Sequence, residues 1–371
     1  MTNLERLFHE QGQSPWLDNL QRSYLSDGTL ERRIAEGIRG ITSNPTIFAK
    51  AIAASDQYDE QFADLLATKT VEDAYWELVI SDIEGALQAF DPVARDAKGA
   101  DGFVSIEVSP ALADDTDGTI RSARYLHERI NRANLFVKIP ATEASVPAIE
   151  AMVSEGRNIN VTLIFSLERY RRVMDAYLSG LEAWVAGGGD ASRVHSVASF
   201  FVSRVDTEAD RRLETIAADS AKAVPARALQ GRLAVAQAQL AYAQFLEVFS
   251  GPRWEALAAK GAHRQRPLWA STSTKNQAYP DLLYVDSLIG PDTVNTMPDA
   301  TVDAFLDHGK LARTVDADPD AARRDFAEAE KLGVDMADVG RVLEEEGVAS
   351  FTKSFDELLQ SLHDKAQAVG R

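Results

Sequence analysis

Short apolar segments alternate with helical patterns along most of the chain. Eight of these segments are rich in Val, Ile, Phe or Trp, which is typical of β-strands. Several are almost continuously apolar, as expected for strands buried on both faces. The predicted strands are 14–19, 38–44, 102–109, 134–141, 160–166, 194–203, 267–273 and 281–287.

Helical periodicity fills most of the intervals between these strands. In residues 166–184 apolar side chains recur at steps of three and four, and Ser166 is placed to cap the start of that helix. Residues 223–249 show the same spacing, and the chain is helical from about residue 319 onward. About 60 residues separate the second and third strands, and about 65 the sixth and seventh, so each gap should hold more than one helix.

Strands that alternate with helices indicate parallel βαβ units, and eight such strands are the number that a (β/α)₈ barrel requires. The sequence therefore predicts an α/β fold of the TIM-barrel type with additional helices. We expect a single barrel domain over residues 1–371, with a helical C-terminal extension that begins at about residue 319.

Composition and charge narrow the classes of function. The chain is 45% hydrophobic and 26% charged, which is ordinary for a globular protein, and no apolar stretch is long enough to predict a membrane span. The opening residues lack the apolar core of a secretory signal, and the chain has no cysteine, which fits a cytoplasmic protein. A net charge of −18 argues against broad nucleic-acid binding, although one local basic pocket can still hold a phosphate.

Lys138 is the most informative candidate residue, because it lies inside an apolar strand. An unpaired buried ammonium is costly, so such a lysine is paired, neutral or not truly buried. A desolvated lysine that gives up its proton can attack a carbonyl carbon and form a Schiff base. The alternative is a lysine at the strand rim, or one that pairs with an acid for structural reasons.

Asp18 and Glu107 fall on the first and third predicted strands, at positions that would face the same barrel mouth. Two carboxylates that face one lysine can serve as general acid and base. The alternative is that each acid neutralises a nearby base. Three charged residues converging from three strands are harder to explain by structure alone.

Further polar residues follow the other predicted strands. Arg204 and Lys275 are candidate phosphate ligands, with Ser273 supplying a hydroxyl, since the end of the seventh strand is a common phosphate position in this barrel. The alternative is a surface turn with solvated charges. Asn44, Thr162 and Ser199 occupy similar strand-end positions.

The phosphate-loop, dinucleotide, nucleophile-elbow and zinc-protease motifs are missing, and no two of the six histidines have metal-ligand spacing, so we expect no metal site.

Five segments around these residues resemble the signature segments of the transaldolase family. They are ITSNPTIF (41–48), SIEVSP (105–110), LFVKIPAT (135–142), NVTLIFSLERY (160–170) and SVASFFVSRVD (196–206), and WASTSTKN (269–276) is similar to the longer bacterial form. The resemblance implies a class I aldolase barrel of the pentose phosphate pathway that needs no cofactor. Such an enzyme moves a dihydroxyacetone unit from sedoheptulose 7-phosphate to glyceraldehyde 3-phosphate, giving erythrose 4-phosphate and fructose 6-phosphate.

The same resemblance implies a role for each candidate residue. Lys138 would form the Schiff base, and Asp18 would take and return the proton during carbon–carbon cleavage. Glu107 would act through a bound water that Thr162 holds. The remaining residues would bind substrate: Asn44 and Ser199 the dihydroxyacetone hydroxyls, and Arg204, Ser273 and Lys275 the phosphate. Two features depart from the family pattern: Lys275 stands where shorter members have arginine, and Ser273 stands where glycine would be expected.

Two other functions stay open at this point. One is a simple aldolase that releases dihydroxyacetone, which would share Lys138. The other is a non-catalytic barrel that binds sugar phosphates, which would be expected to lack at least one of Lys138, Glu107 and Asp18. The sequence is compatible with either a monomer or a homodimer.

Overall fold

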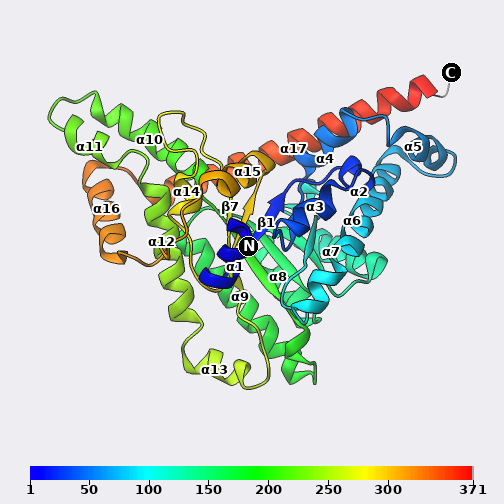
Figure 1. Cartoon of the computed structure of the whole chain (residues 1–371), viewed down its shortest axis with the longest axis horizontal. Coiled ribbons are helices and arrows are strands. Elements are labelled where there is room, and N and C mark those ends of the chain that lie inside the picture. Colours follow the sequence, from blue (N-terminus) through cyan, green and yellow to red (C-terminus); the bar gives the residue numbers. More distant parts are fainter. Residues whose placement is uncertain (370–371) are drawn as a thin grey trace.

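The computed structural model describes residues 1–369, and eight parallel strands in it form one closed barrel. Neighbouring strands follow the order of the chain, and β1 pairs with β8 to close the ring. This confirms the (β/α)₈ barrel (Figure 1). The strands are β1 (Gln13–Asp18), β2 (Ile41–Thr42), β3 (Val104–Glu107), β4 (Leu135–Pro140), β5 (Ile159–Ile164), β6 (Ser196–Phe201), β7 (Arg266–Ala270) and β8 (Thr293–Met297).

Helices surround the barrel and fill the long gaps that the sequence predicts. The gap between β2 and β3 holds α4 to α6, and the gap between β6 and β7 holds α10 to α13. The helices are α1 (Asn3–Gln11), α2 (Arg22–Ser26), α3 (Thr29–Ala35), α4 (Pro45–Ala53), α5 (Asp59–Leu66), α6 (Val71–Asp96), α7 (Thr116–Ile130), α8 (Val146–Ser154), α9 (Leu167–Ala186), α10 (Ser203–Ala217), α11 (Ala223–Leu229), α12 (Leu233–Val248), α13 (Pro252–Ala258), α14 (Leu283–Asp286), α15 (Asp299–His308), α16 (Pro319–Leu332) and α17 (Met336–Val369), with short 3₁₀ turns at Pro110–Leu112 and Ala191–Arg193.

Local chemistry explains where helices begin beside the barrel mouth. The hydroxyl of Ser166 accepts a hydrogen bond from the Arg169 amide at 3.2 Å, so it caps α9 as the sequence predicts. The Asn44 side chain caps α4 in the same way, accepting from the Ile47 amide at 3.0 Å. Pro45 then occupies the first helical position, where its missing N–H costs nothing.

The prediction of the eighth strand at 281–287 is wrong. Residues Leu283–Asp286 of that run form the short helix α14, and the eighth strand is β8, ten residues further on. A short apolar run does not distinguish a buried strand from a buried helix. The apolar pattern does not indicate β8, because Thr293 and Asn295 are polar yet fully buried. They accept hydrogen bonds from Gln13 and Thr272, respectively.

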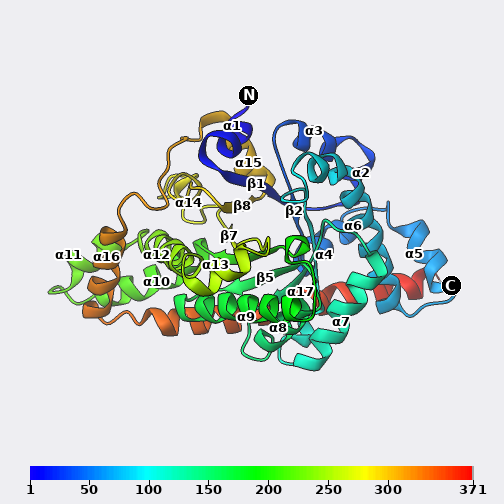
Figure 2. The same cartoon turned by 90° about the horizontal axis from the view of Figure 1, so that it is seen from below.

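The last helix crosses the barrel on the side where the strands end. Figures 1 and 2 show α17 as one long rod that passes from α10 to α5, and α4 packs closely against it. Gly340 and Gly347 allow this close approach, because a Cβ at Gly340 would lie 3.0 Å from the Phe165 carbonyl oxygen. The helical region from 319 is thus confirmed, whereas the assignment of residues 1–371 to a single domain stays a prediction.

Within residues 1–369, no helix is both long and apolar enough to cross a membrane.

Candidate active site

Strand register brings Lys138 and Glu107 together at the mouth of the barrel. The two residues are direct partners on the neighbouring strands β4 and β3, so their side chains leave the sheet side by side. Lys138 Nζ lies 3.0 Å from Glu107 Oε2 and donates a hydrogen bond to the Ser43 carbonyl oxygen at 3.1 Å. Both side chains are almost completely buried, with 6% and 5% exposed. The lysine is therefore paired with an acid rather than solvated at the rim.

The two carboxylates of the site are both in surroundings that disfavour charge. Burial raises the pKa of Glu107 above its ordinary value, although the nearby Lys138 ammonium opposes the effect. Burial also raises the pKa of Asp18, against the pull of Lys138 and of a hydrogen bond from Thr42. A carboxylate with a raised pKa is a stronger proton acceptor than an ordinary one, which suits both residues to proton transfer.

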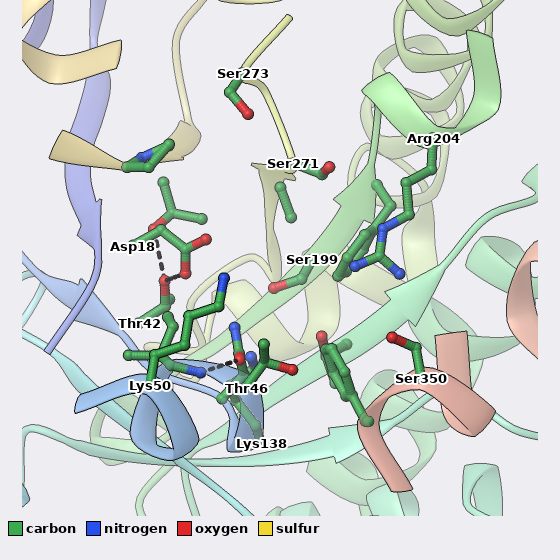
Figure 3. Close-up of a pocket in the computed structure, with 18 of the residues that line it drawn as sticks. Asp18, Thr42, Thr46, Lys50, Lys138, Ser199, Arg204, Ser271, Ser273 and Ser350 are labelled. Carbon is green, nitrogen blue, oxygen red and sulfur yellow. Dashed lines mark hydrogen bonds between the residues drawn. The ribbon is translucent and has the colours of Figure 1, made fainter. Parts of the chain in front are cut away.

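A short chain of hydroxyls fixes Asp18 at the end of β1. Thr42 Oγ1 donates to Asp18 Oδ1 at 2.7 Å and lies 2.7 Å from Thr296 Oγ1. Thr42 ends β2 and Thr296 lies near the end of β8, so these three residues come from neighbouring strands. Asp18 keeps its Oδ2 free of hydrogen bonds to the described residues, and it faces the cavity in Figure 3.

One cavity of about 330 Å³ connects most of the predicted site residues (Figure 3). Its walls include Asp18, Asn44, Lys138, Thr162, Ser199, Arg204, Ser273 and Lys275. Glu107 is the exception, because it lines a separate cavity of about 10 Å³. That volume corresponds to roughly one water molecule.

The Arg204 guanidinium reaches the cavity without an acceptor. It forms no ion pair and donates no hydrogen bond to residues 1–369, and its central carbon lies 5.1 Å from the centroid of the Phe201 ring. Lys275 belongs to the loop that follows β7, and its ammonium donates to Ser273 Oγ at 2.6 Å. The loop after β7 is hydrogen-bonded to the start of α10, since the Ser203 amide donates to the Ser271 carbonyl at 3.0 Å. The unusual backbone in this loop falls on Ser271, with φ of 57°, and not on Ser273.

Strand β5 is distorted beside the site. Leu163 has φ of 59°, which is strained for a side chain of its shape, and the pairing register shifts between Val161 and Ile164. Thr162, between them, is completely buried, and its hydroxyl has no hydrogen-bond partner among the described residues. An unpartnered buried hydroxyl that faces a cavity is available for a water or a substrate.

Several residues of the site were missed by sequence reasoning. One of them is Asn160, whose Oδ1 accepts a hydrogen bond from Ser199 Oγ at 2.7 Å. Asn160 precedes Thr162 by two residues on the same strand, so the alternation of side chains along a strand could have indicated Asn160. Lys50 of α4 and Ser350 and Phe351 of α17 also line the cavity. No local pattern marks these three, because their helices reach the mouth through tertiary packing.

Among residues 1–369, no group of three or more acidic or histidine side chains is arranged to hold a metal ion.

The fold and this site define a (β/α)₈-barrel enzyme, with its pocket at the carboxyl ends of the strands. Residues 15–362 match the family model described as transaldolase/fructose-6-phosphate aldolase. The chain belongs to this family. It is 51% identical to a transaldolase of Thermobifida fusca over 96% of both chains. It is 48% identical to transaldolase 1 of Streptomyces avermitilis, over 99% of this chain and 97% of the relative. A transaldolase of Mycolicibacterium paratuberculosis is 50% identical, over 94% of this chain and 93% of the relative.

Proposed function

We propose that the protein catalyses the transaldolase reaction through a Schiff base on Lys138. In this reaction a dihydroxyacetone unit passes from sedoheptulose 7-phosphate to glyceraldehyde 3-phosphate, and erythrose 4-phosphate and fructose 6-phosphate result. The activity is supported by curated transaldolases at about half identity over nearly the whole chain. The observation that carries the residue assignment is Lys138, which is buried, pairs with Glu107 and lines a cavity large enough for a sugar phosphate.

Imine formation needs a neutral amine and a group that moves protons. The Lys138 amine attacks C2 of the ketose, and the resulting carbinolamine must lose water to give the iminium. Glu107, 3.0 Å from the amine, is placed to take the lysine proton, directly or through one water in the small cavity that it lines. A water bound in the larger cavity, which Thr162 lines together with Lys138, can accept a hydrogen bond from the free hydroxyl of Thr162.

Carbon–carbon cleavage requires a base on the opposite side of the cavity. Asp18 takes the proton of the C4 hydroxyl as the C3–C4 bond breaks, and the bonding electrons move to the iminium to form an enamine. The aldehyde product leaves, the acceptor aldehyde enters, and Asp18 returns the proton after the new bond forms. Thr42 holds the carboxylate in place for both steps.

Substrate binding is assigned to the remaining polar groups of the cavity. The Arg204 guanidinium lacks an acceptor in the described residues and is suited to the fork geometry of a phosphate, with Lys275 and Ser273 beside it. Asn44 uses its oxygen to cap α4, so its amide hydrogens are left for a substrate hydroxyl. Ser199 offers its oxygen as an acceptor. A cytoplasmic location, and a monomeric or homodimeric state, are further parts of this proposal.

An assay with fructose 6-phosphate separates a transferase from a simple aldolase. We expect turnover only when erythrose 4-phosphate is present, with sedoheptulose 7-phosphate as the product. Release of free dihydroxyacetone without an acceptor, at a comparable rate, would instead identify an aldolase. No reaction under either condition would contradict the proposal.

A further inference from the structure

A second cavity lies at the other end of the barrel from Lys138. It has a volume of about 310 Å³, close to that of the active-site cavity. Its walls come from the start of β7 at Arg266, the start of β6 at Ser196, and α13. Figure 1 shows α13 at the end of the molecule away from α17, which crosses the barrel mouth. The cavity is therefore separate from the substrate pocket.

The Arg266 side chain lines this cavity, and its guanidinium has no hydrogen-bond acceptor among the described residues. Its side chain is 20% exposed, and its only ionic neighbour there is Asp101, at 3.8 Å. The oxygens of Asp101 already accept hydrogen bonds from Ser14 and Arg39 at Oδ2 and from Trp16 at Oδ1. A cationic donor that lines a cavity and has no acceptor from the protein is available to an anion that binds there.

Two histidines add further donors on the same wall. The rings of His195 and His263 stack with centroids 4.2 Å apart and an interplanar angle of 20°. Burial, helped by His263 and Arg266, lowers the pKa of His195 to about 3, so this ring is neutral at pH 7 and carries one N–H. No residue in 1–369 forms a hydrogen bond with the His195 ring, whereas His263 Nε2 lies 3.1 Å from the Ser192 carbonyl oxygen.

The charges around the cavity favour an anion of limited size. Arg264 is neutralised by Asp292 at 3.0 Å, and Asp101 is shared between Arg39 and Arg266, so one positive charge is left over. Trp254 supplies an apolar wall. A locally positive pocket in a chain with a net charge of −18 is a specific feature rather than a general one.

We propose that this cavity binds a small molecule through a phosphate-like oxyanion group, held by Arg266 and His195. A tetrahedral oxyanion matches the guanidinium fork and accepts the histidine N–H as well. The cavity has room beyond the oxyanion for the body of a small phosphorylated molecule, which would contact Trp254. The site is independent of the transaldolase chemistry at Lys138.

Sulfate is a suitable probe, because it stays fully charged across the working pH range. Binding is measured by titration calorimetry at constant ionic strength, with chloride replacing sulfate. The Arg204→Ala variant serves as the background, since it weakens the anion site proposed in the active-site cavity. We expect this variant to bind one sulfate, and Arg266→Gln added to it to weaken that binding by about tenfold or more. The exposed Arg227 has no ion pair with residues 1–369, so Arg227→Gln is the matched control and should leave binding unchanged.

Three outcomes decide the proposal. Sulfate binding that is lost with Arg266→Gln but kept with Arg227→Gln supports it. Equal sulfate binding by the Arg204→Ala protein and by its Arg266→Gln and Arg227→Gln derivatives overturns the proposal. No sulfate binding by the Arg204→Ala protein also overturns it. If Arg266→Gln does not fold, as judged by circular dichroism, His195→Phe keeps the ring stack but removes the donor. That variant should weaken sulfate binding severalfold, and unchanged binding would again overturn the proposal.

Discussion

Lys138 Nζ lies 3.0 Å from Glu107 Oε2, and both side chains are buried. Each charge compensates for the burial of the other, because an isolated charge in such a place is strongly disfavoured. A proton that moves from the lysine to the glutamate removes both charges at once and leaves a nucleophilic amine. Under the proposed mechanism, the pair thus combines a structural role with the proton transfer that imine formation needs.

The first prediction separates the two carboxylates. Glu107→Gln should slow the appearance of a borohydride-trappable imine by about 10²–10⁴-fold, the usual contribution of a general acid or base. Asp18→Asn should form that imine at a near-normal rate but accumulate it before cleavage. Mass spectrometry of protein trapped at increasing times measures both rates. Equal trapping rates in the two variants would contradict the division of roles.

The second prediction concerns the phosphate group. Arg204→Ala should reduce kcat/KM for fructose 6-phosphate by about 10- to 150-fold, chiefly by raising KM, since a hydrogen bond to a charged group contributes about 1.5–3 kcal/mol. Lys275→Ala should act in the same direction but more weakly, because an ammonium forms no bidentate fork. Unphosphorylated fructose serves as the control substrate. A loss of the same factor for both substrates would show that Arg204 has a structural role instead.

The third prediction is a pH dependence of stability that comes from Asp206 of α10. Its Oδ1 accepts from the Ala234 amide at 2.7 Å and its Oδ2 from the Tyr284 hydroxyl at 3.0 Å. Burial raises the pKa of Asp206 from 3.8 to about 7, so the folded protein holds this proton more tightly than the unfolded chain. The resulting stabilisation is complete below about pH 4 and is lost as the pH rises to about 7.

Urea unfolding at pH 5 and pH 8 tests this effect. The fall in the free energy of unfolding between these values should be smaller in Asp206→Asn by on the order of 2 kcal/mol. Glu214→Gln replaces an exposed carboxylate on the same helix and should leave the fall unchanged. If Asp206→Asn and the parent protein lose the same free energy, Asp206 is ionised throughout and the assignment is wrong.

The fourth prediction concerns how α17 lies on the end of β5. A Cβ at Gly340 would lie 2.8 Å from Ser166 Cβ and 3.0 Å from a backbone oxygen, whereas one at Gly347 would meet only side chains, the closest being Leu163 Cδ2 at 3.1 Å. Alanine favours a helix over glycine by about 1 kcal/mol, so both changes would otherwise stabilise α17. We expect Gly340→Ala to lower Tm despite this gain, and Gly347→Ala to change Tm little. A higher Tm for Gly340→Ala, measured by circular dichroism, would show that α17 is not held this closely.

The sequence predicted most of the barrel because strands buried on both faces are nearly continuous in apolar residues. This signal failed at β8, where Thr293 and Asn295 are buried through hydrogen bonds rather than through apolar character. It also overextended the second strand, which is only Ile41–Thr42 in the structure. A pattern of apolar residues reports burial and does not report which partner satisfies a polar group.

The candidate site could be predicted where the residues belong to strands. Asp18, Lys138, Thr162 and Ser199 all reach one cavity, because the ends of parallel strands meet at one face of a barrel. Lys50, Ser350 and Phe351 could not be predicted in this way. They come from α4 and α17, and only the packing of these helices across the mouth brings them to the cavity.

The most direct measurement asks which lysine carries the imine. Lys138, Lys50 and Lys275 all line the same cavity, so peptide mapping after trapping can tell them apart. Treatment with borohydride and fructose 6-phosphate should inactivate the enzyme and leave a reduced three-carbon fragment on Lys138 alone. Lys138→Met should show no label, and chelating agents should not change the activity of the parent protein. A fragment on Lys50 or Lys275, or full activity with no label on any lysine, would contradict the assignment of Lys138 as the nucleophile.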